Sequence, residues 1–232
     1  MNTLIIIPAY NEAANIVKVV ESLSSLKNQA DYVIVNDGSR DQTAGICMEK
    51  GYPIINLPVN VGLAGAFQAG VKYALRNGYD SVLQFDGDGQ HNAFFVDKMI
   101  DRMEACGCDI VIGSRFVQEK RPKSLRMLGN GLIQFAIAVT TKRKITDPTS
   151  GMRIYNQKML GILAESADLS PEPDTIAFLA RSGACIQELH ITMNERLAGK
   201  SYLTFSRSIR YMMHMCLSIF FIQWFRKKLT IS

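Results

Sequence analysis

The stretch at 86–91, DGDGQH, combines residue types and a spacing that suit metal chemistry. Asp86 and Asp88 are separated by a single glycine, and Gln90 adds a carbonyl oxygen. Hard divalent cations prefer oxygen ligands of this kind, and a metal held here would neutralise a departing diphosphate. A glycine-rich turn with solvated aspartates explains the same stretch, so the motif alone leaves both interpretations open. His91 is expected only to face solvent.

A second acidic stretch, DGS at 37–39, follows an apolar run. Ser39 or Asp41 is expected to cap the helix that comes next, as short polar side chains commonly do. That cap does not need Asp37, whose carboxylate we therefore expect to accept hydrogen bonds from a nucleotide base. The glycine-rich stretch at 60–70 opens a helix and could bring backbone N–H groups close to a phosphate, although it lacks the P-loop lysine.

Short β-branched runs alternate with helical patterns in the first half of the chain, which is typical of parallel strands joined by covering helices. The predicted strands are 4–9, 32–37, 53–58, 81–86 and 108–114, and the predicted helices are 11–26, 39–51 and 64–78. We therefore predict an α/β fold with a mostly parallel central sheet flanked by helices. Ligands of such sheets bind beyond the carboxyl ends of the strands, so Asn11, Asp37 and Asp86 are expected to share one site.

The regular alternation of strand and helix patterns ends at about Ser114. The chain continues with a basic loop at 116–126, helices at 127–144, 157–165 and 171–183, and strands at 151–156 and 186–193. No low-complexity linker interrupts the sequence. We therefore predict one catalytic domain at 1–205, followed by an amphipathic C-terminal helix at 206–232.

Composition narrows the class of protein. The chain has 232 residues, of which 47% are hydrophobic and 20% charged, which suits one folded globular domain. Five irregularly spaced cysteines are expected to be reduced thiols in an intracellular protein. The apolar stretch at 211–225 is shorter than the roughly 20 residues that a membrane-spanning helix needs. The net charge of +5 suits phosphates or an anionic membrane surface.

Six motifs occur together in a characteristic order: IIIPAYNEAANI, VNDGSRDQT, NVGLAGAFQAG, QFDGDGQH, GSRF and DPTSGMR. This ordered set resembles the family-2 inverting glycosyltransferases of the A-type nucleotide-sugar-binding fold, over about residues 3–200. It is most similar to the dolichol- and polyprenyl-phosphate hexose (mannose or glucose) synthases. The resemblance implies a metal-dependent enzyme that moves a hexose from a UDP- or GDP-linked sugar to a polyprenyl phosphate. A non-catalytic scaffold would have no need for both carboxylates.

The resemblance also implies roles for individual residues. The residues implied in nucleotide-sugar binding are Pro8, Ala9, Tyr10, Glu12, Asp37, Gly65, Gln68, Asp86, Gly87, Asp88, Arg196 and Lys200. Those implied in holding Mg²⁺ or Mn²⁺ are Asp86, Asp88 and Gln90. Those implied in acceptor binding are Arg115, Arg126, Asn130 and Arg153. Arg115 would grip the acceptor phosphate, and Asp147 would lie near the sugar, which makes Asp86, Asp88, Arg115 and Asp147 candidate catalytic residues.

The acceptor remains open between two classes. A sugar hydroxyl, on a cell-wall or capsular polysaccharide or a lipid-linked intermediate, needs a general base, for which Glu172 and Asp174 are the candidates. A lipid phosphate is already anionic and needs only positioning and charge matching. The two carboxylates would then do no more than favour the positive end of the helix that follows them.

Two apolar helices end in basic residues, at 127–144 and at 207–228. Trp224 followed by Arg226, Lys227 and Lys228 is typical of a membrane interface, where indole rings and cations meet anionic lipid. Packing against a second subunit in a homo-oligomer is the alternative. We expect a cytoplasmic protein that is peripheral at the inner face of the cell membrane, with a nucleotide sugar and a polyprenyl-phosphate or glycan acceptor as partners and no nucleic acid.

Overall fold

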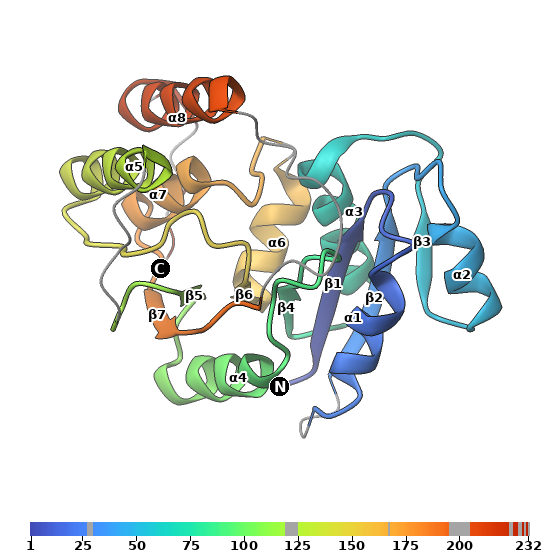
Figure 1. The fold of residues 1–232 in the computed structure, drawn as a ribbon. Coiled ribbons are helices and arrows are strands. Elements are labelled where there is room, and N and C mark those ends of the chain that lie inside the picture. The colour runs from blue at the N-terminus through green and yellow to red at the C-terminus, as the bar shows by residue number, and fades with distance from the viewer. Residues whose placement is uncertain are drawn as a thin grey trace.

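The computed structural model describes residues 1–26, 30–118, 125–166, 168–194, 205–222, 225–226, 229 and 231. A seven-stranded sheet of order β3-β2-β1-β4-β6-β5-β7 runs through the molecule, with helices on both faces (Figure 1). The elements in chain order are β1 (Thr3–Ala9), α1 (Ile16–Leu23), β2 (Asp31–Asn36), α2 (Thr43–Glu49), β3 (Ile54–Asn56), α3 (Gly62–Arg76), β4 (Ser81–Gln84), α4 (Phe94–Cys106), β5 (Ile110–Ser114), α5 (Leu125–Thr141), β6 (Arg153–Asn156), α6 (Gln157–Glu165), α7 (Pro173–Arg181), β7 (Ile186–His190) and α8 (Phe205–Phe220).

Strand β1, in the middle of the sheet, is apolar along most of its length because both faces of the sheet are covered there. Side chains alternate between the faces along β1. Leu4 and Ile6 enter one buried cluster, which includes side chains of α3 and α6. Ile5 and Ile7 enter the other, which includes side chains of α1 and α4. The mostly parallel sheet flanked by helices is thus confirmed.

One central strand, β6, runs antiparallel to both of its neighbours. Arg153, its first residue, pairs with Gln84 at the end of β4 and with Ile112 near the end of β5. The segment that enters β6 therefore lies at the same edge of the sheet as the segments that leave β4 and β5. This reversal brings residues 147–152 to the carboxyl edge of the parallel strands.

The last helix, α8, packs against α5 and α7 on one face of the sheet (Figure 1). Met215 and Ile219 of α8 are buried in the core on that side. At Gly129 of α5, an added Cβ would come within 1.3 Å of the Met212 sulfur, so the absence of a side chain there leaves room for Met212 of α8. In the part of the chain that the structure describes, no helix is both long and apolar enough to cross a bilayer.

Three details differ from the expectations drawn from the sequence. Helix α1 begins at Ile16 rather than at residue 11, because Asn11 has a φ of 57°, which a right-handed helix does not allow. Helix α4 was not predicted. Cys106 and Cys108 form a disulfide, so the expectation of five reduced cysteines is wrong for this pair; Cys47, Cys185 and Cys216 are free thiols.

Candidate active site

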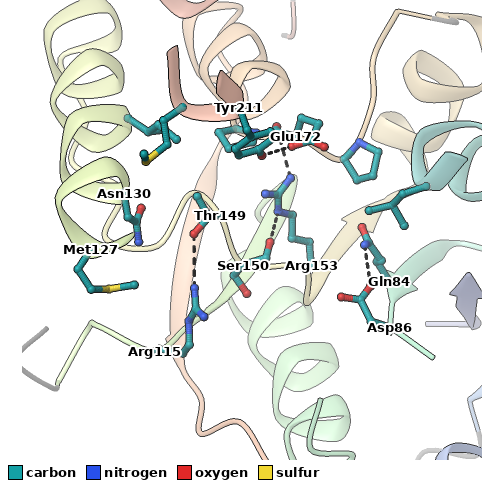
Figure 2. A pocket seen from close by; sticks show the side chains of 16 residues that line it. Gln84, Asp86, Arg115, Met127, Asn130, Thr149, Ser150, Arg153, Glu172 and Tyr211 are labelled. Carbon is teal, nitrogen blue, oxygen red and sulfur yellow. Dashed lines mark hydrogen bonds between the residues drawn. The ribbon is translucent and has the colours of Figure 1, made fainter. Parts of the chain in front are cut away.

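A cavity of about 440 Å³ lies at the edge where β4 and β5 end and β6 begins (Figure 2). Helices α5 and α8, the starts of α3 and α7, and the loops before β6 and α7 supply other parts of its wall. Polar side chains from these separate segments face this space, among them Gln84, Asp86, Arg115, Arg153, Glu172 and Tyr211. Concave sites with a few convergent polar groups are the usual places for ligands.

Asp86 is held in a fixed orientation by its neighbours. Gln84 Nε2 donates to its Oδ1 at 3.1 Å, and the Asp86 backbone N–H donates to His91 Nδ1 at 2.9 Å. The His91 Nε2 lies 3.6 Å from Asp86 Oδ2. His91 is 3% exposed, so the expectation that it faces solvent is wrong. Its ring packs edge-to-face against Phe85 instead, and this contact holds the imidazole in place beside Asp86.

The acidic loop lies against the end of β1 and the loop that follows it. An added Cβ on Gly87 would come 3.0 Å from the Pro8 carbonyl oxygen and 3.6 Å from the side chains of Ala9 and Glu12. Asp88 closes the loop, since its Oδ1 accepts the Gln90 N–H at 3.0 Å. The predicted nucleotide and metal residues at these two strand ends are therefore brought together.

The two aspartates suit a divalent cation. The Asp86 side chain is 34% exposed and lines the cavity, and Asp88 is half-buried. A Cβ at Gly151 would come 2.6 Å from Asp86 Oδ2, so the glycine leaves this oxygen room for a ligand. No group of three His, Cys, Asp or Glu side chains fit for a metal exists among the described residues. A cation at Asp86, Asp88 and Gln90 would complete its shell with oxygens of the bound diphosphate and water.

Asp37 caps a helix that the sequence did not associate with it. Its two carboxylate oxygens accept the backbone N–H groups of Val61 and Gly62, at 2.7 and 2.9 Å, at the start of α3. Each carboxylate oxygen can accept a second bond, so contact with a nucleotide base stays a prediction. At the start of α2 it is Asp41 that accepts the Thr43 N–H, at 2.9 Å, whereas Ser39 accepts the N–H of Asn11.

Arg115 and Asp147 form a two-pronged ion pair at the cavity. Arg115 Nε and Nη2 donate to the two Asp147 oxygens at 2.6 and 2.8 Å, the strong geometry for this pair of groups. The Asp147 side chain is fully buried, whereas that of Arg115 is 30% exposed. No described residue accepts a hydrogen bond from the second terminal nitrogen, Nη1. The pair presents a cation to the cavity in one fixed orientation.

Glu188, on β7, holds the backbone segment that carries Asp147. The sequence did not indicate this role. The Glu188 carboxylate accepts the N–H groups of Thr146 and Asp147, at 2.8 and 3.0 Å, and the Thr146 hydroxyl at 2.9 Å. It touches Asp147 only through the backbone of the 146–147 segment. A glutamate in an alternating strand gives no sign of such a task, because its partners lie about 40 residues earlier in the chain.

Arg153 and Glu172 also line the cavity. Arg153 is 1% exposed and donates to the carbonyl oxygens of Ser150 at 2.8 Å, Pro148 at 2.7 Å and Glu172 at 3.5 Å. It braces the loop that enters β6, and direct contact with an acceptor stays a prediction. Tyr211 of α8 donates its hydroxyl to Glu172 Oε2. Burial raises the pKa of Glu172 above its ordinary value; the Tyr211 hydrogen bond and the Arg153 charge oppose this, and the Asp174 charge adds to it.

Asp174 and Gln68 are not part of the cavity wall, and each is bonded to another part of the protein. Asp174 accepts hydrogen bonds from the Ser218 hydroxyl at 2.7 Å and from Arg226 at 3.2 Å, so it anchors α8 rather than facing a ligand. Gln68 donates to the Ser166 carbonyl at 3.2 Å, beside α6. Asn130 does line the cavity, and it is 4% exposed.

Several predicted residues lie outside the described part of the chain. These are Arg196, Lys200, Trp224, Lys227 and Lys228, together with the side chain of Arg126. Their predicted roles in closing the site, binding the acceptor phosphate and meeting a membrane stay predictions.

The sequence of the chain matches the family model described as glycosyl transferase family 2 over residues 4–162. The chain belongs to this family. This glycosyltransferase is 29% identical over 223 residues to the polyprenol monophosphomannose synthase of Mycolicibacterium smegmatis. The alignment covers 87% of this chain and 81% of the relative. It is 28% identical over 218 residues to the undecaprenyl-phosphate mannosyltransferase of Micrococcus luteus, with 88% of each chain covered.

The fold of this glycosyltransferase is also found in solved structures. Glucosyl-3-phosphoglycerate synthase from Mycobacterium tuberculosis, in complex with Mn²⁺, UDP and phosphoglyceric acid, matches with a TM-score of 0.69 at 16% identity. The match covers 94% of this chain and 78% of that one. At this identity the likeness establishes the shared fold alone.

Proposed function

We propose that this glycosyltransferase is metal-dependent and inverting, and moves a hexose from a UDP- or GDP-linked sugar to a polyprenyl phosphate at the cytoplasmic face of a membrane. One observation carries the proposal. A single cavity has the carboxylate of Asp86 on one side and the guanidinium of Arg115 on another (Figure 2). A cation held at the first would favour the donor diphosphate, and the second favours an anionic acceptor.

The chemistry is an in-line displacement at the anomeric carbon of the hexose. An oxygen of the acceptor phosphate forms the new bond to this carbon, while the bond to the diphosphate breaks and the nucleoside diphosphate leaves with the electron pair. A metal at Asp86 and Asp88 would supply charge neutralisation for the leaving diphosphate. Arg115, fixed by Asp147, aims the attacking phosphate, and no residue needs to remove a proton from an acceptor that is already anionic.

The direct test offers the purified protein a panel of UDP- and GDP-hexoses, with a short polyprenyl phosphate and Mn²⁺ or Mg²⁺. We expect transfer from one donor in the panel, an inverted anomeric configuration in the product, and no transfer once the cation is chelated. Transfer that proceeds equally well in excess chelator would contradict the metal requirement. Transfer only to glycan hydroxyls would reject the phosphate acceptor.

A hydroxyl acceptor is the second candidate, because Glu172 lines the cavity with a raised pKa, as suits a general base. If Glu172 is a base, the transfer rate should rise with pH through that raised pKa, since only the ionised form accepts a proton. Glu172→Gln would then remove this limb and lower kcat by about 10²-fold or more. With a phosphate acceptor we expect Glu172→Gln to retain most of the transfer rate and to show the same pH dependence as the wild type. The pH profiles of the two proteins therefore distinguish a hydroxyl acceptor from a phosphate acceptor.

The membrane location rests on the outward faces of α5 and α8. Leu132, Phe135 and Val139 of α5 are exposed, as are Met213, Leu217 and Phe221 on or just beyond α8. Residues 125–144 and 205–228 together hold nine of the 26 Lys and Arg side chains and none of the 21 Asp and Glu, which leaves 17 basic against 21 acidic side chains elsewhere. An apolar face on the most basic segments of the chain is complementary to an anionic bilayer surface.

Exchanging Phe135 and Phe221 together for Gln should weaken binding to phosphatidylglycerol vesicles by about 10²-fold to 10³-fold, since each ring buried in lipid contributes on the order of 2 kcal/mol. Co-sedimentation with vesicles of graded composition measures this. Phe94→Gln is the matched control, because Phe94 is as exposed as Phe135, at 64%, but lies on α4. Unchanged vesicle binding, together with loss of a dimer in the double variant, would assign this face to a second copy of the chain.

A further inference from the structure

Gln84 is the last residue of β4 and lies in the wall of the cavity between Asp86 and its cross-strand neighbour Arg153. Its Nε2 donates to Asp86 Oδ1 at 3.1 Å. A carboxylate can only accept hydrogen bonds, so this contact fixes which end of the amide is the nitrogen. The carbonyl oxygen Oε1 then points away from Asp86 (Figure 2).

This carbonyl oxygen has no partner in the part of the chain that the structure describes. It is buried, and no described residue donates a hydrogen bond to it. Almost every buried polar atom in a folded protein is paired, because an unpaired one gives up its contact with water and gains nothing in return. Asn130, on the α5 side of the same cavity, likewise has no described partner for either of its side-chain polar atoms. Two unpaired amides in one cavity indicate a polar ligand.

The chemistry of the missing partner of Gln84 is restricted. Oε1 needs a donor, whereas a diphosphate, an acceptor phosphate and the Asp86 carboxylate offer only acceptor oxygens. The hydroxyl groups of a hexose are the donors that the proposed substrates bring to this part of the site. We propose that Gln84 is a sugar-specificity residue, whose carbonyl oxygen accepts a hydrogen bond from one hydroxyl of the transferred hexose. This proposal rests on the proposed function.

A double-mutant cycle tests it. The wild-type protein and Gln84→Met, which keeps the length of the side chain but lacks the acceptor, are assayed with the preferred nucleotide sugar and with its monodeoxy analogues. In the wild type, removing the bonded hydroxyl should lower kcat/KM by about 10-fold to 100-fold, the usual cost of leaving a buried group unpaired. In Gln84→Met, the penalty at that one position should disappear, while penalties at the other positions stay.

The cycle separates recognition from damage to the site. A loss of metal affinity through Asp86 would lower kcat/KM for every donor equally and leave each deoxy penalty unchanged. Gln84→Asn, which withdraws the amide by one methylene, should remove the same penalty as Gln84→Met. Gln187→Met is the control, because Gln187 accepts a hydrogen bond from Arg102 at 3.2 Å outside the cavity, and it should preserve all penalties.

If every deoxy analogue carries the same penalty in Gln84→Met as in the wild type, the proposal is overturned and Oε1 is assigned to a buried water. A wild-type protein that transfers no sugar from any nucleotide donor would overturn the proposed function, and this proposal with it. Sugar transfer without coupling between Gln84 and any hydroxyl of the hexose would overturn only the sugar-specificity role. The two failures therefore give different results in the same assay.

Discussion

Asp147→Asn should lower kcat/KM by about 10²-fold and destabilise the fold on the order of 3 kcal/mol. The exchange keeps the shape of the side chain but removes the charge that both prongs of Arg115 meet, at 2.6 and 2.8 Å. The guanidinium would then lose its fixed orientation, and the acceptor would lose its positioning. Initial rates and thermal unfolding of the same preparations measure both effects.

Glu188→Gln should disturb the same ion pair, but less severely than Asp147→Asn. Glu188 acts on the pair only through the backbone at 146–147, so its loss should raise KM for the acceptor more than it lowers kcat. Asp109→Asn is the matched control. Asp109 bonds to Asn156 at 3.0 Å and to the Cys185 N–H at 2.7 Å at the other end of β5, so it should change stability alone. An Asp147→Asn protein with wild-type kinetics and a lower unfolding temperature would show that the ion pair serves only the fold.

Asp88→Asn should lower the transfer rate by about 10³-fold, because metal stabilisation of the leaving diphosphate is worth several kcal/mol. The amide retains an oxygen that can accept the Gln90 N–H, now 3.0 Å from Asp88 Oδ1, so the loop should keep its shape. Titration with Mn²⁺, followed by electron paramagnetic resonance, should show weaker metal binding in parallel with the lost activity.

Asp80→Asn controls for the removal of a negative charge near β4. Asp80 lies just before the first residue of that strand, at the opposite edge of the sheet, and accepts the N–H of Asn2 at 2.7 Å. This variant should bind Mn²⁺ and transfer sugar as the wild type does. Near-normal turnover by Asp88→Asn at saturating Mn²⁺ would remove Asp88 from the metal site.

The fold could be predicted from the sequence because its signal is local. Runs such as LIIIPA and YVIVND are too apolar and β-branched for anything but strands covered on both faces. The rule that ligands bind beyond parallel strand ends then placed Asp37 and Asp86 at one edge. The antiparallel direction of β6 could not be predicted in this way, because a short strand pattern carries no direction.

The functional partners of individual residues were harder to predict, since they depend on distant contacts. Asp174 was a candidate base from its position before a helix, yet the structure pairs it with Ser218, 44 residues later. The amphipathic pattern of α8 identified a helix but not which of its faces meets the protein. Tyr211 therefore emerged as a cavity residue only once α8 was placed against α5 and α7.

The position of α8 has a consequence for how the protein is made. Tyr211 and Met212 complete the wall of a cavity whose other sides come from segments synthesised earlier. A chain emerging from the ribosome can form the sheet while Glu172 and Asp174 still lack their α8 partners, since folding during synthesis begins at the N-terminus. Sugar transfer should therefore appear only after α8 has been synthesised and has packed against α5 and α7.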